Sequence, residues 1–463
     1  MHKSSGRNHL NKKIRKGLIV TIEIIAVLVV VLFLVGLFLG IPANYIIYGP
    51  NVASGIGSKL LCSSIYVTGY SREQAFNDLV QYSSILEQLT IEYNDESRTV
   101  TTSLFGIQEK SASALPNLGC TVNYEGHTQR QELITQAGPK NQAPWPLGNG
   151  VATIDANMQR LIESLVASDN AAGLNTRALL VAHDGAVIAE AYDQEANASS
   201  PLLGWSMAKS LMAVALGNLE YRGLLDLDQA PGFSEWNDER KQISLVDMLN
   251  MADGLEFSEE YDPGDDATAM LFTEPSASAY VMQQGALHKP GAFFNYSSGT
   301  ANLLSKVHQD TLGSPQIAYD DFRENIFLPM GFQDAVFETD ASGLFVGSSY
   351  FYASAQDWAR LGQVMLNDGT INGQRIVSAD WVQTATSPNQ TENDKAYGYQ
   401  WWLNRGNERL RFENLPADMY YASGNRRQFI MVFPSQNAVI VRLGWSSGPY
   451  PISDNFGRIL ESL

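Results

Sequence analysis

Hydrophobic and polar residues divide the first forty positions of the chain into two different segments. Residues 1–17 are polar and basic, and residues 18–41 form an apolar run that contains a single charge, Glu23. As a helix, this run of 24 residues spans about 36 Å, which exceeds a bilayer core of about 30 Å. Six cations and no acid precede the run, which places the N-terminus in the cytoplasm. We therefore predict a cytoplasmic tail, a single-pass anchor in the inner (cytoplasmic) membrane, and an extracytoplasmic, periplasmic remainder.

A cleaved signal peptide is the alternative interpretation of the apolar run. Its apolar region would be shorter, about 7–15 residues, and would end at a small-residue site of the A-x-A type. The run instead ends in FLGIPANYI, which has no such site. The sequence therefore favours an uncleaved signal-anchor, with the membrane as a partner of the chain.

Residues 42–137 carry the patterns of a small module. Ser71 is a capping residue type ahead of the predicted helix REQAFNDLVQYSSILEQL, and LTIEYNDESRTVTTSLFG predicts two strands around an Asn-Asp turn. Cys62 and Cys120 are the only cysteines, and both follow the predicted anchor. An oxidising exterior favours a disulfide between them, and two separately buried thiols remain the alternative.

Residues 151–463 carry the patterns of one large domain. We predict an amphipathic helix over 155–168, a hairpin that turns at Asp184-Gly185, and a second hairpin that turns at Pro434–Asn437. Helical patterns fill the middle, from 245 to 385. The expected fold is mixed α/β, with an antiparallel-rich sheet flanked by helices, an α-rich inserted subdomain, and one preceding transmembrane helix. The predicted organisation is a tail at 1–17, an anchor at 18–41, a module at 42–137, a linker at 138–150 and a domain at 151–463.

Composition and charge exclude several classes of function. Hydrophobic residues make up 44% of the chain and charged residues 17%, which excludes a disordered chain or a coiled-coil rod. The net charge is −18, with the acidic excess after the predicted anchor, so we expect no nucleic-acid partner. Six histidines and two cysteines stand in no clustered ligand spacing, so we expect no metal and no cofactor.

A serine and a lysine stand three positions apart at the start of a predicted buried helix. Ser206 and Lys209 lie in GWSMAKSLMAVALGNLEYRG, whose apolar residues keep helical spacing. Positions i and i+3 share a helix face, so the amine can reach the hydroxyl. Burial lowers the pKa of a lysine, and a neutral amine can activate a serine as a nucleophile. The Ser-x-x-Lys pattern is degenerate, however, and a capping serine followed by a solvated lysine is the alternative.

Further segments carry a resemblance to a known family, in order and at matching separations. Beside GWSMAKS they are SLVDMLNMADGLEFSEEYD, KPGAFFNYSSGTANLL, FETDASGLFVGSSYFYASAQDWARLGQVMLNDG, YGYQWWLN and ASGNRRQFIMVFP. Between residues 178 and 443 the chain resembles the serine β-lactamase-like hydrolases related to class C β-lactamases. It is most similar to the branch of 6-aminohexanoate-dimer hydrolase and related esterases. The resemblance implies the β-lactamase/transpeptidase-like fold, which agrees with the fold expected above.

The resemblance also implies roles for four residues. Ser206 would be the acylated nucleophile, and Lys209 would be its base. Tyr296 would carry the proton to the leaving group, and the neighbouring lysine ammonium would lower the pKa of its phenol. Ser298 stands where relatives carry a polar residue, often Asn, that touches the substrate amide. For Tyr296, the local sequence leaves a half-buried core tyrosine as the alternative.

A further motif departs from the family pattern. Relatives place Lys or His, a small residue and then Gly on the strand that lines the site, and the best-aligned residues here are Asn425, Arg426 and Arg427. The first cation is missing, and an arginine replaces the glycine. We expect this segment to contact substrate, with one arginine either clamping a carboxylate or pointing into solvent. The oxyanion would be held by the backbone N–H of Ser206 and by one near Arg427.

These patterns together predict a membrane-anchored extracytoplasmic serine hydrolase that acts through an acyl-enzyme. Its partner would be a small-molecule or peptide acyl substrate. Esters and linear amides rank ahead of peptidoglycan peptides and β-lactams, because the usual Lys or His is missing. The alternative is a non-catalytic protein that binds a ligand or the cell wall on the same scaffold. The natural substrate, the oligomeric state and the role of residues 42–137 stay open.

Overall fold

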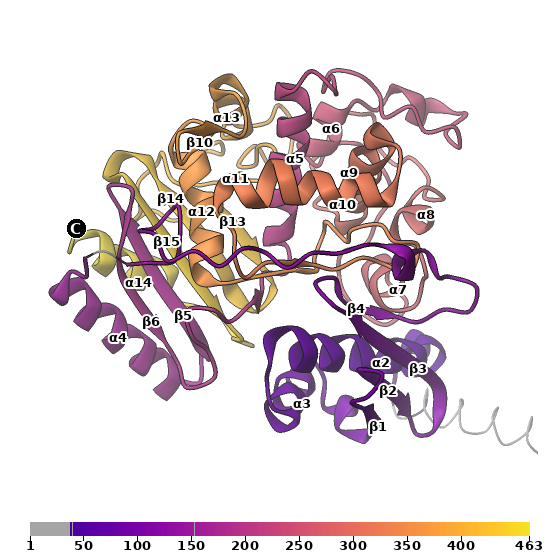
Figure 1. The fold of residues 1–463 in the computed structure, drawn as a ribbon. Helices are drawn as coiled ribbons and strands as arrows, with labels where there is room; N and C mark the ends of the chain where they lie inside the picture. Colours follow the sequence, from indigo (N-terminus) through magenta and orange to yellow (C-terminus); the bar gives the residue numbers. More distant parts are fainter. Residues whose placement is uncertain (1–37, 39, 152) are drawn as a thin grey trace, which may run out of the picture.

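The computed structural model describes residue 38 and residues 40–151 and 153–463 (Figure 1). The predicted cytoplasmic tail and nearly all of the predicted anchor lie outside the described residues, so both stay predictions. Over the described ranges, each helix is either too short or too polar to cross a bilayer.

A six-stranded antiparallel sheet forms the centre of the larger domain, in the order β12-β13-β14-β15-β5-β6 (Figure 1). Both predicted hairpins are confirmed. Asp184 and Gly185 join β5 to β6 with φ angles of 49° and 76°, which suit a tight two-residue turn. Pro434–Gln436 and the left-handed Asn437 join β14 to β15. The strands are β5 (Thr176–His183), β6 (Ala186–Tyr192), β12 (Trp402–Leu403), β13 (Tyr420–Gly424), β14 (Gln428–Phe433) and β15 (Ala438–Gly444).

Helices cover both faces of this sheet. On one face, α4 (Ala156–Ala171) and α14 (Ile452–Leu460) bury their apolar sides against one set of alternating strand residues. On the other face, α12 (Ala355–Leu366) packs against the opposite set, over β14, β15 and β5. The helix predicted from the periodicity of 155–168 is therefore confirmed as α4.

The α-rich insertion predicted between the two hairpins is present, and most of it lies to the right of the sheet in Figure 1. A small antiparallel sheet of β7, β9 and β8 and a two-stranded ribbon of β10 and β11 accompany it. The helices are α5 (Met207–Tyr221), α6 (Leu245–Leu249), α7 (Asp266–Phe272), α8 (Ala277–Val281), α9 (Ser298–Leu312), α10 (Pro315–Asp321), α11 (Leu328–Met330) and α13 (Ala379–Ala385). The short strands are β7 (Leu202–Leu203), β8 (Val336–Phe337), β9 (Phe351–Ala353), β10 (Thr370–Ile371) and β11 (Gln374–Arg375).

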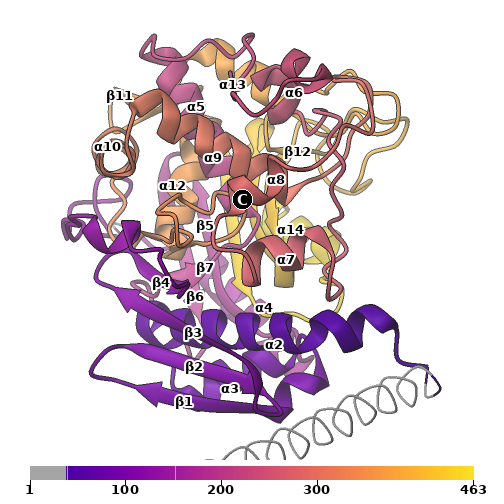
Figure 2. The same cartoon turned by 90° about the vertical axis from the view of Figure 1, so that its right-hand side faces the viewer.

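The N-terminal module, residues 43–122, packs a long helix across a four-stranded antiparallel sheet (Figure 2). The predicted cap is confirmed, because Ser71 Oγ accepts a hydrogen bond from the Gln74 N–H at 3.1 Å. The sequence did not predict α2, whose small residues give no hydrophobic period. Gly57 shows why they are small: a Cβ there would lie 2.7 Å from Leu89. The elements are α2 (Ala43–Ser63), α3 (Arg72–Val80), β1 (Leu89–Asn94), β2 (Thr99–Leu104), β3 (Ile107–Leu115) and β4 (Gly119–Val122).

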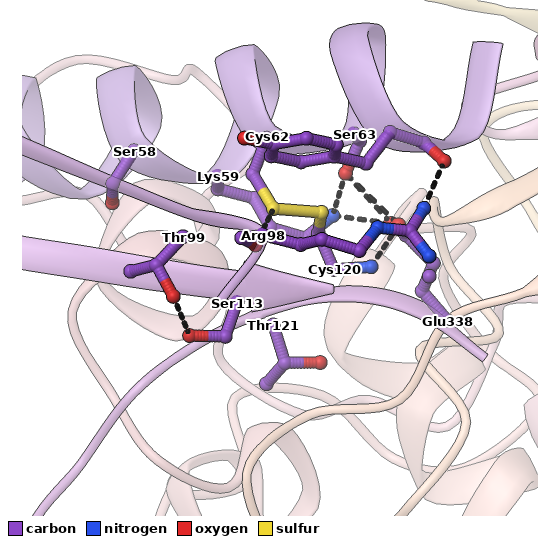
Figure 3. The surroundings of a disulfide bond; sticks show 12 residues. Ser58, Lys59, Cys62, Ser63, Arg98, Thr99, Ser113, Cys120, Thr121 and Glu338 are labelled. Carbon is purple, nitrogen blue, oxygen red and sulfur yellow. Dashed lines mark hydrogen bonds and ion pairs between the residues drawn. A yellow bond between two sulfur atoms is a disulfide. The ribbon is translucent and has the colours of Figure 1, made fainter. Parts of the chain in front are cut away.

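The predicted disulfide is present and stands where the module meets the larger domain (Figure 3). It joins Cys62 of α2 to Cys120 of β4, with their Cα atoms 6.0 Å apart. The buried carboxylate of Glu338, from the larger domain, accepts hydrogen bonds from the Cys120 N–H at 2.6 Å and from Ser63 Oγ at 2.9 Å, and it pairs with the Lys59 ammonium. The disulfide therefore fixes two hydrogen-bond donors that dock the module on the larger domain.

The predicted linker, residues 138–150, runs along the larger domain. The fully buried Arg360 of α12 donates to the carbonyl oxygens of Pro146 at 2.8 Å and Gly148 at 2.6 Å. Because these carbonyls are held by a buried guanidinium, the connector has a fixed path.

Candidate active site

Ser206 stands at a sharp turn between strand β7 and helix α5. Gly204 opens the turn, and a Cβ at this position would lie 2.1 Å from the ring of Trp358. Trp205 follows with a φ of 48°, a left-handed conformation that side-chain-bearing residues rarely adopt. Ser206 occupies the N-cap position of α5, and its N–H has no hydrogen-bond partner among the described residues. The turn therefore presents a hydroxyl and a free backbone donor together.

Lys209 lies one helical turn along α5, as the sequence predicts, and its side chain is buried. Its Nζ donates to Ser206 Oγ at 2.9 Å, Ser298 Oγ at 3.0 Å and the Ser348 carbonyl oxygen at 3.0 Å. Burial lowers the pKa of Lys209 to about 8, and the nearby charge of Glu259 opposes this shift. A large fraction of this amine is therefore neutral near pH 8, in contact with the hydroxyl that it would deprotonate.

Tyr296 reaches the same cluster from the segment that leads into α9. The Lys209 Nζ lies 4.9 Å from the centre of its ring, and Trp402 stacks on the ring at 5.2 Å. Burial and the charge of Glu259 raise the pKa of Tyr296, whereas its hydrogen-bonding contact with Ser206 lowers it. The expectation of a lowered phenol pKa is therefore wrong, because desolvation and a carboxylate outweigh the neighbouring amine. Tyr296 is a neutral phenol, which can donate a proton.

Ser298, the first residue of α9, is fully buried between the lysine and a carboxylate. Its Oγ donates to Glu259 Oε1 at 2.5 Å, and its N–H donates to Glu259 Oε2 at 2.7 Å. The Tyr261 hydroxyl donates to the same carboxylate at 2.7 Å. Ser298 thus joins the predicted cluster, but it lies beneath the nucleophile and links Lys209 to Glu259.

Sequence reasoning missed Glu259 and Tyr261. They lie in SEEYD, within a segment that carries the family resemblance, but their partner Ser298 is far along the chain. Tyr261 has a φ of 66°, another left-handed conformation at a non-glycine residue. Three carboxylates and a tyrosine in five residues gave no local signal that distinguishes a site from a solvated loop.

The segment that the sequence assigns to substrate binding divides between two places. Gly424, at the end of β13, is the residue whose backbone approaches the nucleophile turn, because a Cβ there would lie 2.0 Å from the Gly204 carbonyl oxygen. Asn425 is exposed next to it, and its N–H has no hydrogen-bond partner within the described ranges. The structure does not bring the two arginines to Ser206. Arg426 is buried over the ring of Tyr82, and the exposed Arg427 donates to the Gly448 carbonyl oxygen at 3.1 Å.

The assembled cluster has the parts that acyl transfer requires: a hydroxyl, a base within hydrogen-bond reach, a proton donor and free N–H groups. Across residues 40–151 and 153–463, no group of three or more His, Cys, Asp or Glu side chains could hold a metal ion. In the cluster itself, Ser206 carries the hydroxyl, Lys209 the amine and Tyr296 the phenol.

Known proteins show which family shares these features. Residues 158–458, more than half of the chain, match the family model described as Beta-lactamase. The 6-aminohexanoate-dimer hydrolase of Paenarthrobacter ureafaciens is 24% identical over 350 residues, which cover 69% of this chain and 84% of that protein.

Two solved structures share the fold at low sequence identity. A family VIII carboxylesterase superposes with a TM-score of 0.52 at 14% identity, covering 67% of this chain and 98% of that chain. A penicillin-binding protein homologue from Caulobacter crescentus superposes with a TM-score of 0.53 at 15% identity, covering 66% of this chain and 97% of that chain. The predicted mixed α/β fold of the β-lactamase type is therefore confirmed for the larger domain.

Proposed function

The chain belongs to the beta-lactamase family, and we propose that it is a serine hydrolase that cleaves an ester or amide bond through an acyl-enzyme on Ser206. One observation carries this proposal: the buried Lys209 amine touches Ser206 Oγ at 2.9 Å and has a pKa lowered to about 8. The structural lysine Lys59 is also buried beside a hydroxyl, but it pairs directly with the Glu338 carboxylate. Lys209 has no such direct carboxylate partner among the described residues, so its amine can lose the proton while it contacts Ser206.

Acylation begins with proton transfer from the serine to the lysine. The neutral amine of Lys209 accepts the Ser206 proton while Oγ forms a bond to the substrate carbonyl carbon. The carbonyl π electrons move onto oxygen, where the N–H groups of Ser206 and Asn425 are available to stabilise the negative charge. Both donors are backbone groups, so the missing Lys or His leaves this part of the mechanism unaffected.

Tyr296 completes the proton path to the leaving group. Its phenol donates a proton to the leaving alcohol or amine as the C–O or C–N bond breaks, and the Lys209 ammonium returns a proton to the phenolate oxygen. Water then attacks the acyl carbon and gives one proton to the neutral Lys209 amine, and the resulting ammonium returns this proton to Ser206 Oγ as the C–Oγ bond breaks. The products are a carboxylic acid and an alcohol or amine, and the enzyme returns to its starting state.

Esters and linear amides are the proposed substrate class. The strand that approaches the nucleophile turn reads Ala422, Ser423, Gly424 and offers no cation to a substrate carboxylate. Among the similar proteins, one is described as a hydrolase of 6-aminohexanoate dimer and another as a carboxylesterase. The two descriptions support an amide or an ester as the bond that is cleaved.

We further propose that the chain is a membrane-anchored protein with its enzyme domain outside the cytoplasm. The apolar run 18–41, the six cations before it and a disulfide after it support this proposal. The expected result is that the full chain stays with the membrane in alkaline carbonate and that its larger domain is digested by protease added to spheroplasts. Release by carbonate, or full protection from protease, would contradict it.

The hydrolase proposal is tested with the full chain in detergent micelles. We expect a fluorescent fluorophosphonate to label the wild type and p-nitrophenyl butyrate to be turned over, whereas Ser206→Ala loses both. The matched control is Ser210→Ala, on the same helix, whose hydroxyl donates to the Gln400 carbonyl oxygen. A folded wild type that shows neither labelling nor turnover of any ester or amide would instead support the non-catalytic binding protein.

A further inference from the structure

We propose that the N-terminal module is part of the catalytic unit, because its Tyr82 is a positioning residue that holds Trp205 and, through it, the Ser206 nucleophile. This inference rests on the proposed function of Ser206. It assigns to the module a role beyond spacing the larger domain from a membrane.

The strand that leads to the nucleophile lies against the module. Thr68 Oγ1 of the module donates to the Pro201 carbonyl oxygen at 3.0 Å, directly before β7. Leu202 and Leu203 of β7 line a small hollow together with Leu60 of α2 and other residues of the module. The chain from Pro201 to Ser206 therefore follows a surface that the module supplies on one side.

Trp205 is the main point of contact between the module and the nucleophile turn. Its indole is 4% exposed and lies among three aromatic rings. The ring centre of Tyr82 is 6.2 Å away, edge to face, that of Tyr350 is 6.1 Å away, and that of Trp445 is 6.5 Å away. Aromatic pairs at these distances stabilise a fixed ring orientation. Of the three rings, Tyr82 belongs to the module, and the ammonium of the module's Lys59 covers Tyr350 at 3.9 Å.

Tyr82 is itself held from both sides. It follows α3, where the Asp78 carboxylate accepts two hydrogen bonds from the Arg177 guanidinium at 2.8 and 2.7 Å, and both side chains are buried. The Asp78 carbonyl oxygen accepts a further hydrogen bond from Trp445 Nε1 at 2.9 Å. On its other side, the guanidinium of Arg426 covers the Tyr82 ring at 3.9 Å from its centre.

Arg426 ties the module to the second wall of the active site. It directly follows Asn425, whose N–H is a proposed oxyanion donor, and it has a left-handed φ of 61°. Its carbonyl oxygen accepts from the Ser446 N–H at 3.2 Å and from Arg442 at 3.3 Å. The ring of Tyr82 therefore contacts both the residue before the nucleophile and the residue after Asn425.

The strain in the nucleophile turn explains why such support matters. A left-handed conformation at a tryptophan costs on the order of 1–3 kcal/mol and persists where the surroundings hold it. If the Trp205 ring were released, the peptide before Ser206 could relax and move both Oγ and the Ser206 N–H. A displacement of about 1 Å at a reacting group can cost about a hundredfold in rate.

The test compares Tyr82→Leu with Tyr93→Leu in the full chain. Tyr93 is a matched control, because it is also a partly buried tyrosine of the module that packs on the core and contacts an arginine, Arg72, at 4.3 Å. We expect Tyr82→Leu to lower kcat for p-nitrophenyl butyrate by about tenfold to a hundredfold, while its KM stays within about threefold of wild type. The activity of Tyr93→Leu should also stay within about threefold of wild type. Tyr82→Phe, which keeps the ring, should retain near wild-type kcat.

The unfolding temperature separates positioning from general loss of structure. Both leucine variants should unfold at similarly lowered temperatures, well above the assay temperature, while Tyr82→Leu alone is labelled slowly by the fluorophosphonate. The inference is overturned if Tyr82→Leu and Tyr93→Leu have the same kcat. It is also overturned if Tyr82→Leu changes KM and leaves kcat at the wild-type value. A wild type that is neither labelled nor active would overturn the proposed function and this inference together.

Discussion

Two lysines in two regions of the molecule are buried to nearly the same degree and are surrounded differently. Lys59, where the module meets the larger domain, is 2% exposed, and Lys209, in the active site, is 1% exposed. Lys59 pairs directly with the Glu338 carboxylate and covers the ring of Tyr350. Lys209 touches two hydroxyls and a carbonyl oxygen, and the Glu259 carboxylate, whose charge raises its pKa, is separated from it by the Ser298 hydroxyl.

The comparison teaches that burial alone does not make a lysine a base. Burial lowers the pKa of both side chains, and a carboxylate opposes the shift in both. For Lys59, loss of its proton would leave Glu338 as an unpaired buried charge, so the pair is a structural unit. For Lys209, loss of the proton leaves only neutral neighbours and a more distant carboxylate, so the amine is free to act.

Substitution of the active-site lysine should cause the greatest loss of activity. Lys209→Met removes the base but keeps the length and burial of the side chain, so we expect kcat/KM to fall by about 10²–10⁴-fold. The measurement is hydrolysis of p-nitrophenyl butyrate, with the unfolding temperature as a control. A variant that keeps more than a tenth of wild-type activity would contradict the role of Lys209.

The same substitution at the other lysine should affect stability. Lys59→Met leaves the Glu338 carboxylate buried without its cation, which costs about 3–5 kcal/mol in unfolding free energy. Denaturant unfolding measures this loss. In the Lys59→Met background, Glu338→Gln should recover part of the stability, because it removes the unpaired charge, and no recovery would mean that the pair is not the source.

The disulfide should contribute somewhat less to the unfolding free energy than the ion pair of Lys59 and Glu338. Replacing Cys62 and Cys120 together by serine frees a loop with a sequence separation of 58 residues. We expect the unfolding free energy to fall by about 2–4 kcal/mol. Non-reducing unfolding curves of the double variant and the wild type give the difference, and identical curves would show that docking on Glu338 holds the loop without the disulfide.

Substitution of Glu259, the carboxylate of the active site, should shift the pH profile and have the least effect on activity. Glu259 raises the pKa of Lys209, so Glu259→Gln should move the acidic midpoint of the kcat/KM profile to lower pH. Glutamine keeps one oxygen that can accept from the Ser298 and Tyr261 hydroxyls, but its NH2 group cannot accept from the Ser298 N–H, so one hydrogen bond of the cluster is lost. A midpoint that moves to higher pH would mean that the charge of Glu259 does not act on the base.

The features that the sequence predicted correctly are those set by neighbouring residues. Asp184-Gly185 determines a hairpin turn by its own backbone preferences, and Ser71 caps the helix that follows it. Ser206 and Lys209 meet because a helix brings residues three apart onto one face. Each of these contacts needs only a few residues of context.

The features that the sequence did not predict depend on contacts between distant segments. Burial by distant segments, followed by the charge of Glu259 across the insertion, raises the pKa of Tyr296, so the sign of this shift could not be obtained from the local sequence. Arg426 follows a strand that lines the site, but its side chain lies on Tyr82 of the module. No periodicity marks α2, because its small residues are selected by close packing on the module's sheet.

The pH dependence of phosphonylation tests the central claim most directly, since it reports the base that activates Ser206 without any later step. The second-order rate constant for labelling by a fluorophosphonate is measured from pH 6 to pH 11. The neutral amine is the active form and its pKa is about 8. The labelling rate should therefore rise with pH up to about this value and reach a plateau above it. A rate that does not depend on pH, or that keeps rising until the ordinary lysine pKa of about 10.4, would contradict the account.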